Sequence, residues 1–217
     1  QAGAEVIKIE RPGTGDPVRS YPPFKEGKSI LFELLNGGKH SVALDLKDQA
    51  PRSHLLDLVR SVDVLVEQFR PGVMARLQLD FDSLRAVHPE LIYCSISGYG
   101  QHGARNQVVG HDLNYQAWAG LLALAGEHDG RRIVPALIAD IAGGAHAAVI
   151  NILLALRSRE QTGQGCYLDI AMTDGLFPFM LSAVANWSAG NAVPGAGNDL
   201  LTGASPRYQL YRTADGR

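Results

Sequence analysis

The fold of this chain is decided by Leu91-Ile92-Tyr93-Cys94-Ser95-Ile96, followed at once by Ser97-Gly98-Tyr99-Gly100. The first six residues form a short apolar run bounded by turn residues, which is typical of a buried strand. The glycines then turn the chain out of the sheet. We therefore expect a buried strand whose carboxyl end opens into a loop of small residues.

Strands and helices alternate on both sides of this run. The expected strands are 5–10, 41–46, 63–66, 91–96 and 167–170, and the expected helices are 49–61, 80–87, 113–125, 144–159 and 172–187. Residues 41–66 are interpreted as one strand, crossover helix, strand unit. Such alternation builds a parallel, doubly wound sheet, so we predict an α/β, Rossmann-like fold. Ligands of these sheets bind outside the carboxyl ends of the strands.

Loops and turns add candidate phosphate contacts. Residues 14–38 are rich in Gly and Pro without a sustained period, which predicts a long surface loop. Arg11 and Arg70 each open an Arg-Pro-Gly turn after a predicted strand, where an arginine can clamp a phosphate. These two and Arg76 are either phosphate ligands or ordinary surface charges. No GxGxxG or GxxxxGK[ST] loop occurs, which removes the main support for a dinucleotide or P-loop site.

The composition excludes several classes of protein. The 217 residues carry 20 Lys and Arg against 22 Asp and Glu, so the net charge of −2 provides no general basic field for nucleic acid or an anionic membrane. Cys94 and Cys166 have neither metal-ligand nor disulfide spacing. The apolar stretches 117–125 and 133–156 offer no uninterrupted membrane span. We expect a cytoplasmic protein without metal, nucleic acid or membrane contact.

Both ends of the chain suggest truncation. Gln1-Ala2-Gly3-Ala4 leads directly into a predicted strand without an initiator Met, and the last residues are a strand pattern that ends in the hairpin turn Asp215-Gly216. We expect a large domain at 1–187, a linker at 188–206, and the start of a second, smaller domain at 207–217.

Three acids and one histidine stand where charge is unusual. Asp112 follows His111 just before a predicted helix, and Asp140 and Asp174 lie at the starts of two apolar helices. Each Asp suits a helix N-cap, and His111 suits a loop. Alternatively, apolar neighbours could raise the pKa of Asp140, His111 could transfer protons near neutral pH, and Asp174 could attack an activated acyl group. Spacing alone leaves both interpretations open.

Seven sequence blocks occur in the order seen in class III CoA-transferases, of the formyl-CoA and carnitine CoA-transferase type, and in α-methylacyl-CoA racemases. The blocks are 6–13, 38–47, 69–73, 91–93 with 97–101, 110–115, 140–144 and 162–165. They cover almost the entire chain, which resembles this superfamily and is most similar to its racemase branch. The resemblance implies an enzyme with a large Rossmann-like domain, a smaller second domain, and two subunits interlocked as a homodimer.

The resemblance also implies a site for coenzyme A, which enters as part of an acyl-CoA substrate, with no tightly bound cofactor. Arg11 and Arg76 would contact the phosphates. The nucleotide and pantetheine arm would lie along Leu44, Asp45, Leu46, Lys47, Gln68, Phe69, Arg70, Gly110, Asp112, Leu113, Asn114 and Tyr115. His40 and His102 depart from the residues usual in the superfamily, which affects fine CoA contacts but not the fold.

Two chemistries compete within this superfamily. In the racemase branch, which the 110–115 and 140–144 blocks favour, the residues matching His111 and Asp140 remove and return the α-proton of a 2-methylacyl-CoA. Backbone N–H groups near Gly143-Gly144 would then suit the enolate oxygen. In the transferase alternative, Asp174 would form a mixed anhydride and then an aspartyl-CoA thioester, from which CoA passes to a second acid. The acyl group and any acceptor acid stay open.

Overall fold

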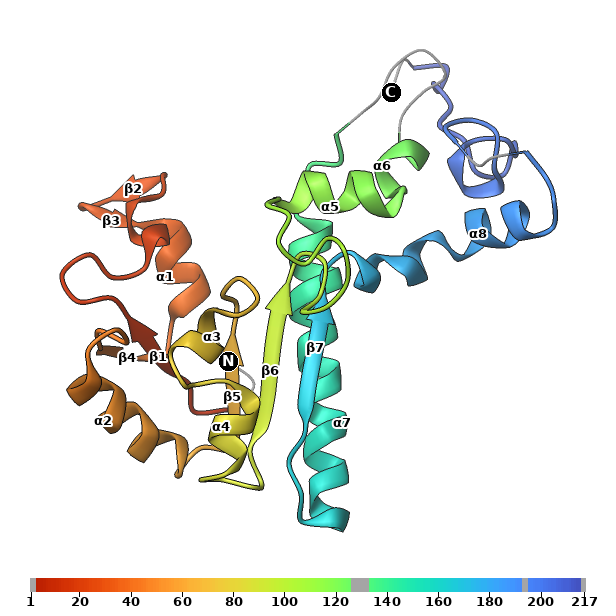
Figure 1. The fold of residues 1–217 in the computed structure, drawn as a ribbon. Helices are drawn as coiled ribbons and strands as arrows, with labels where there is room; N and C mark the ends of the chain where they lie inside the picture. The colour runs from red at the N-terminus through yellow and green to blue at the C-terminus, as the bar shows by residue number, and fades with distance from the viewer. Residues whose placement is uncertain (1–2, 126–132, 193–194, 216–217) are drawn as a thin grey trace. The chain divides into compact units, whose positions relative to one another are not determined.

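The computed structural model describes residues 3–125, 133–192 and 195–215. The chain divides into two compact units, residues 1–61 and 62–217. Each unit has its own parallel sheet (Figure 1).

The first unit is built around two parallel strands. β1 (Ile7–Glu10) pairs with β4 (His40–Ala43), and Ile9 lies opposite Val42. The other elements of this unit are the 3₁₀ helix η1 (Pro17–Ser20), the hairpin strands β2 (Phe24–Lys25) and β3 (Lys28–Ser29), and the helices α1 (Ile30–Asn36) and α2 (Gln49–Val59).

The prediction of a loop over residues 14–38 is wrong, because this segment contains η1, the β2–β3 hairpin and α1. The Ser29 side chain accepts the Phe32 N–H at 3.2 Å and so caps α1. Apart from Pro17, the first residue of η1, the glycines and prolines of the segment lie between these elements. They concealed a short helix whose Leu34 and Leu35 are largely exposed.

Glu10 fixes the chain that follows β1. Its side chain is buried and accepts hydrogen bonds from Nε and Nη2 of Arg19 (both 2.8 Å), the Ser41 hydroxyl (2.8 Å) and the Asp16 N–H (2.9 Å). These bonds, with that from Arg19 the strongest, lower the pKa of Glu10 to about 2. Arg19 also lies 3.9 Å from the centroid of the Phe32 ring. The segment after β1 is therefore held by charge-assisted bonds.

The second unit contains a three-stranded parallel sheet in the order β5 (Val64–Glu67), β6 (Ile92–Ser97), β7 (Tyr167–Ala171). The apolar run at 91–96 is thus the central strand, as its buried composition requires. The predicted parallel α/β fold is confirmed. The pairing differs in one respect: β4 pairs with β1 and β5 with β6, so residues 41–66 do not form a strand, helix, strand unit within one sheet.

The other elements described in this unit are helices. In the described part of the unit they are α3 (Val73–Arg76), α4 (Phe81–Arg85), α5 (Asp112–Ala119), α6 (Leu121–Leu124), the π-helix η2 (Ala139–His146), α7 (Ala147–Thr162), the 3₁₀ helix η3 (Asp174–Met180), α8 (Leu181–Ser188) and the 3₁₀ helix η4 (Leu200–Thr202). The helix predicted at 113–125 is divided at Gly120, whose φ is 96°. The helix predicted at 172–187 is divided into η3, which contains Pro178, and α8.

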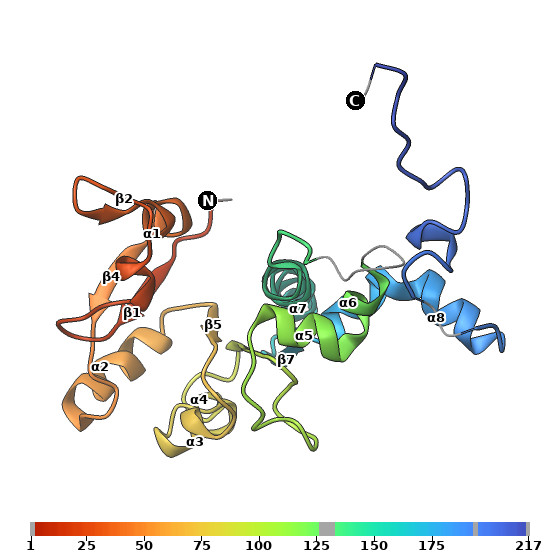
Figure 2. The same cartoon turned by 90° about the horizontal axis from the view of Figure 1, so that it is seen from above.

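Helices cover both faces of the sheet. On one face, the ring centroid of Phe81 in α4 lies 6.2 Å from that of Tyr93 and 5.6 Å from that of Tyr167. On the other face, Ala148 of α7 packs against Cys94. Since consecutive strand residues point to opposite faces, Tyr93 and Cys94 show which helix covers which face. α7 runs beside β7 in Figure 1 and is seen end-on in Figure 2, and the doubly wound arrangement is confirmed.

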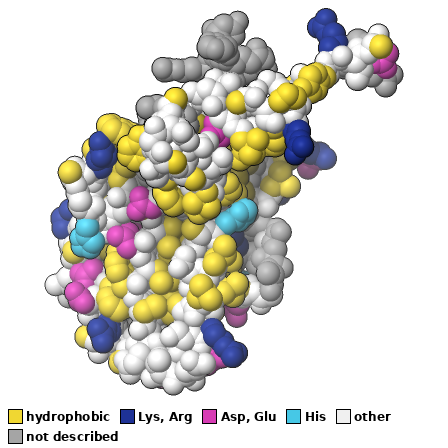
Figure 3. Space-filling view, turned by 90° about the vertical axis from the view of Figure 1, so that its right-hand side faces the viewer, with side chains coloured by type: hydrophobic (Ala, Val, Ile, Leu, Met, Phe, Trp, Pro, Cys, Tyr) yellow, Lys and Arg dark blue, Asp and Glu magenta, His cyan; other side chains and the backbone are white. Residues whose placement is uncertain are grey.

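η2 and α7 form one continuous helix, Ala139–Thr162, which is long and apolar enough to cross a membrane by length and composition, with a mean hydropathy of 1.6. Asp140, His146 and Asn151, the polar residues that interrupt the apolar stretch 133–156, lie inside this helix. Ala148 packs on the sheet and Ala155 is buried, but only 28% of the most apolar window of this helix is buried. Four apolar residues of α7 are more than half exposed: Val149, Ile150, Leu153 and Leu154. Hydrophobic side chains also gather on the molecular face drawn in Figure 3.

The C-terminal residues differ from their sequence pattern. Residues 208–211 form no strand, and no strand pairs with them in the described part of the chain. Within the predicted linker, the buried carboxylate of Asp199 accepts hydrogen bonds from the Ser182 hydroxyl (3.2 Å) and the Asn186 amide of α8. The residues that precede η4 are therefore tied to α8.

Candidate functional site

The candidate site lies at the carboxyl ends of β6 and β7. The segments that follow these two strands stay hydrogen-bonded to each other. The Met172 N–H donates to the Ser97 carbonyl (2.8 Å), and both the N–H (3.1 Å) and hydroxyl (2.6 Å) of Thr173 donate to the Gly98 carbonyl. This pairing sets Asp174, the first residue of η3, at the edge of the sheet. The candidate residues thus lie where ligands of parallel α/β sheets generally bind, outside the carboxyl ends of the strands.

Two glycines join the helices that carry Asp140 and Asp174. A Cβ added to Gly175 of η3 would lie 2.2 Å from the Gly143 carbonyl oxygen, and one added to Gly143 of η2 would lie 2.3 Å from the Met172 carbonyl oxygen. Only glycine permits this backbone contact. Gly143 and Gly144 are both buried, and Gly143 makes this close contact; the role of their N–H groups toward an enolate oxygen stays a prediction.

Asp112 holds the start of η2. Its buried carboxylate accepts the Asp140 N–H at 3.0 Å and the Gln116 side-chain amide at 2.5 Å. Asp112 is the first residue of α5, but its side chain caps the start of η2. The cap of α5 is His111, whose N–H donates to the Asn114 side chain at 3.0 Å.

His111 and Asp140 are electrostatic neighbours. Burial and the negative charge of Asp112 raise the pKa of Asp140, and His111 opposes that rise. Asp140 is half-buried, whereas the His111 side chain is exposed. An imidazole and a carboxyl of raised pKa therefore lie close together at this end of the sheet.

The first of two hollows adjoins His111. We name it the His111 hollow; it has a volume of about 450 Å³ and is lined by His111, Asp112, Leu113, Gln116, Ile133, Val134, Pro135, Ala136 and Leu137. Residues 133–137 give this hollow a mostly apolar lining, which suits an apolar part of a ligand.

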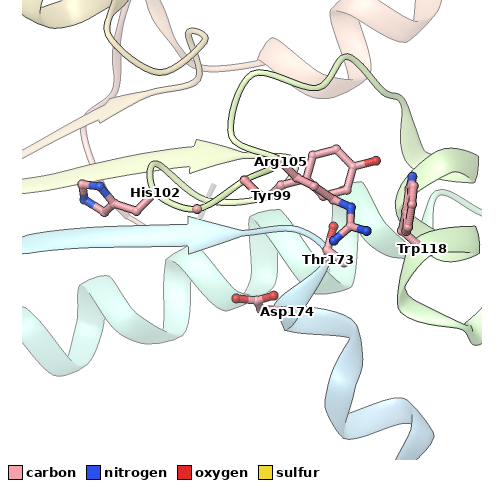
Figure 4. A pocket seen from close by; sticks show the side chains of 8 residues that line it. Tyr99, His102, Arg105, Trp118, Thr173 and Asp174 are labelled. Atoms are coloured by element: carbon pink, nitrogen blue, oxygen red, sulfur yellow. The ribbon is translucent and has the colours of Figure 1, made fainter.

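The second hollow, which we name the Asp174 hollow, adjoins the other candidate acid. It has a volume of about 240 Å³ and is lined by Tyr99, His102, Gly103, Ala104, Arg105, Trp118, Thr173 and Asp174 (Figure 4). The Asp174 side chain is exposed there. The carboxylate is thus accessible as a nucleophile.

Tyr115 is a packing residue between these regions. Its hydroxyl donates to the Gly110 carbonyl at 2.5 Å, and its ring meets that of Tyr99 edge-on with centroids 5.3 Å apart. A Cβ on Gly98 would lie 2.3 Å from the Tyr115 ring, so Gly98 makes room for it.

The remaining predicted CoA contacts lie at two other strand ends. Arg11 directly follows β1, and residues 44–47 directly follow β4, so both reach the same edge of the first unit's parallel pair. In the second unit, residues 68–70 follow β5 and Arg76 ends α3. The structure therefore groups these predicted contacts within each unit.

Glu67 and Asp169 were missed as site-forming residues. Glu67 is buried, accepts the Phe69 N–H at 2.8 Å and the Ser95 hydroxyl, and so shapes the turn after β5. Burial raises the pKa of Glu67. Asp169 accepts the Gln101 N–H at 3.0 Å and so holds the loop after β6. The sequence signal for both was an acidic residue in an otherwise apolar strand, at the end of β5 for Glu67 and inside β7 for Asp169.

The strands, the covering helices and the acids at the carboxyl edge define a parallel α/β domain with titratable groups where such domains bind ligands. The family model for CoA-transferase family III matches residues 1–217, and the chain belongs to this family of enzymes. The resemblance to this superfamily is confirmed, whereas the greater similarity to its racemase branch is not, because the relatives include CoA-transferases as well as racemases.

Relatives with both chemistries match the chain. Acetyl-CoA:oxalate CoA-transferase of Acetobacter aceti is 41% identical over 88% of this chain and 50% of its own length. Alpha-methylacyl-CoA racemase of Homo sapiens is 36% identical over 99% of this chain and 53% of its own length. The solved structure of a CAIB/BAIF family protein from Brucella suis has a TM-score of 0.81 and 34% identity, over 89% of this chain and 53% of that one. The chain spans about half the length of the curated relatives it matches.

Proposed function

We propose that the whole protein is a 2-methylacyl-CoA racemase or epimerase that removes and returns an α-proton through His111 and Asp140. The observation that carries this proposal is the half-buried Asp140 carboxyl, whose pKa is raised by burial and by Asp112 and which interacts with His111. A carboxyl of raised pKa and an imidazole can each act as base and, once protonated, as acid.

The reaction follows from the chemistry of a thioester. Its carbonyl makes the α-hydrogen acidic, so one base takes the proton from one face of the α-carbon and leaves an enolate. The conjugate acid of the other base then gives a proton to the opposite face. Asp112 keeps the backbone of Asp140 fixed during both steps.

Coenzyme A would be held as part of the substrate. In the first unit, Arg11 is proposed to bind phosphate and Leu44–Lys47 to contact the nucleotide. In the second unit, Arg76 is proposed to bind phosphate and Gln68–Arg70 to contact the nucleotide. Both arginines are exposed, Arg11 directly after β1 and Arg76 at the end of α3, and a guanidinium can donate two parallel hydrogen bonds to phosphate, which supports this assignment.

Class III CoA transfer is the second candidate, and the accessible Asp174 carboxylate favours it. In that reaction Asp174 attacks the acyl-CoA thioester and CoA leaves as the thiolate, giving a mixed anhydride. The thiolate then attacks the aspartyl carbonyl, which releases the first acid and leaves an aspartyl-CoA thioester. A second acid takes the CoA by the reverse of these steps.

An interlocked homodimer in the cytoplasm completes the proposal. The exposed apolar residues of α7 support a further covering surface, since contiguous apolar patches of a soluble protein mark interaction sites. Light scattering of the full-length protein tests the dimer: a monomeric mass would contradict it.

The two chemistries are separated by three variants of the full-length protein. Racemisation of (R)-2-methylacyl-CoA is followed by chiral chromatography, and CoA transfer to added carboxylic acids by mass spectrometry. We expect His111→Ala and Asp140→Asn each to lower racemisation by at least about 100-fold, and Asp174→Asn to leave it within an order of magnitude. CoA transfer that stops in Asp174→Asn, without racemisation by the unmodified protein, would establish the second candidate instead.

A further inference from the structure

The Asp174 hollow contains groups that proton transfer by His111 and Asp140 does not use. Arg105 and Thr173 lie on one side of it in Figure 4, near Trp118, and His102 lies at the other end. The hollow thus combines a permanent cation, aromatic rings and an exposed carboxylate within one small volume.

Arg105 is held by stacking rather than by an ion pair. Its guanidinium carbon lies 3.9 Å from the centroid of the Trp118 ring. In the described part of the chain, no ion pair or hydrogen bond of its guanidinium occurs. A guanidinium stacked by its face keeps the N–H donors of its edge for a planar acceptor, and a carboxylate fits that edge with two parallel bonds.

A second donor lies in the same hollow. The hydroxyl of Tyr99 is buried and has no hydrogen-bond partner among the described residues. In Figure 4 it points toward Trp118, on the side where Arg105 lies. The edge-on contact with Tyr115, 5.3 Å between centroids, fixes its ring. A buried hydroxyl without a partner is costly, so this donor favours a ligand that brings an acceptor oxygen.

We infer that the Asp174 hollow is a carboxylate subsite, in which Arg105 and Tyr99 bind a carboxylate group. The inference rests on the proposed acyl-CoA chemistry and adds a substrate class to it. The carboxylate has two possible sources: the free end of a dicarboxylic acyl group on CoA, or a free acid that accepts CoA. Either source brings a carboxylate to the same two groups, the Arg105 guanidinium and the Tyr99 hydroxyl.

The test uses the full-length protein and two acyl-CoA substrates of similar size, 2-methylsuccinyl-CoA and the neutral 2-methylpentanoyl-CoA. The readout is the ratio of their kcat/KM values for α-proton exchange. Arg105→Met keeps the side-chain stem without the charge, and we expect it to lower this ratio by about 10- to 100-fold. Tyr99→Phe lowers the ratio by about 5-fold.

Arg85→Met is the matched control. Arg85 also lies over an aromatic ring, that of Phe81 at 5.8 Å, but it belongs to α4, outside the hollow. This variant leaves the ratio unchanged. An equal effect of Arg105→Met on both substrates, or none, overturns the inference for the acyl source.

The free-acid source has its own arm. CoA transfer to succinate is compared with transfer to butyrate, and loss of the preference for succinate in Arg105→Met supports the acceptor source. Binding of succinate itself, measured by saturation-transfer NMR, is the readout without turnover. If the unmodified protein shows neither α-proton exchange nor CoA transfer, the proposed function is refuted. If Arg105→Met binds succinate as tightly as the unmodified protein does, the subsite is refuted.

Discussion

Asp112→Ala removes the carboxylate that fixes the start of the helix carrying Asp140. Asp112 is 6% exposed and receives two hydrogen bonds, from the Asp140 N–H at 3.0 Å and from the Gln116 amide at 2.5 Å. Bonds to a charged group contribute about 1.5 to 3 kcal/mol each, and part of this is offset because a buried charge is removed as well. We expect the free energy of unfolding to fall by about 3 kcal/mol in Asp112→Ala and by about 1 kcal/mol in Asp112→Asn, whose carbonyl still accepts one bond.

Urea unfolding of the full-length protein, followed by circular dichroism, measures this loss. Asp82→Ala is the control, because Asp82 is also an acid in the first turn of a helix but is exposed. It should change the free energy of unfolding by less than about 1 kcal/mol. An Asp112→Ala protein within about 0.5 kcal/mol of the unmodified one would refute the structural role of Asp112.

The same residue links stability to acid-base chemistry. Burial and the Asp112 charge raise the pKa of Asp140. Asp112→Asn removes the charge while keeping the cap, so the pKa of Asp140 falls and the acidic limb of the pH dependence of kcat/KM moves to lower pH. A limb that stays in place or moves upward would contradict the assignment of Asp140 as the titrating base.

Three further predictions concern packing and charge. Gly175→Ala brings a Cβ to 2.2 Å from the Gly143 carbonyl oxygen and should lower the free energy of unfolding by at least about 2 kcal/mol. The control Gly195→Ala, whose Cβ has its nearest neighbouring atom at 3.8 Å, should lower it by less than about 1 kcal/mol. Similar unfolding midpoints of the two variants would contradict the close contact. Glu10 has a folded pKa of about 2, below its ordinary value near 4.5, so the stability that it contributes is present above pH 4.5 and lost as the pH falls toward 2. Glu10→Gln should therefore lower the free energy of unfolding by about 2 to 3 kcal/mol at pH 7 and by less at pH 3. A loss of stability that does not depend on pH would refute this. Phe81→Ala removes the ring between α4 and the sheet and should cost about 3 kcal/mol by thermal unfolding, and an unchanged melting temperature would show that α4 is not packed there.

The sheet was predictable because its signal is local. The apolar run at 91–96 and the shorter runs at 63–66 and 167–170 have strand composition whatever lies around them, and alternation with helices implies parallel pairing. α1 was missed because turn residues on both sides dominate its composition. The predicted strand at 208–211 failed because a strand needs a partner, and local pattern does not supply one.

The site was predictable in its residue types but not in its connections. His111, Asp140 and Asp174 stood out as charges at helix starts, and the structure places them at the edge of one sheet. The bond from the Asp140 N–H to Asp112 spans 28 positions, and the contact of Gly143 with Gly175 joins two separate helices. Such contacts depend on tertiary packing, which neither periodicity nor composition encodes.

α-Proton exchange in D₂O, measured separately on the R and S forms of 2-methylacyl-CoA by NMR, tests the two-base chemistry most directly. Each base serves one face, so His111→Ala should abolish racemisation while one enantiomer still exchanges its α-proton through Asp140, and Asp140→Asn should leave exchange only in the other enantiomer. Equal exchange of both enantiomers in either variant, or no exchange in the unmodified protein, would contradict proton transfer by His111 and Asp140.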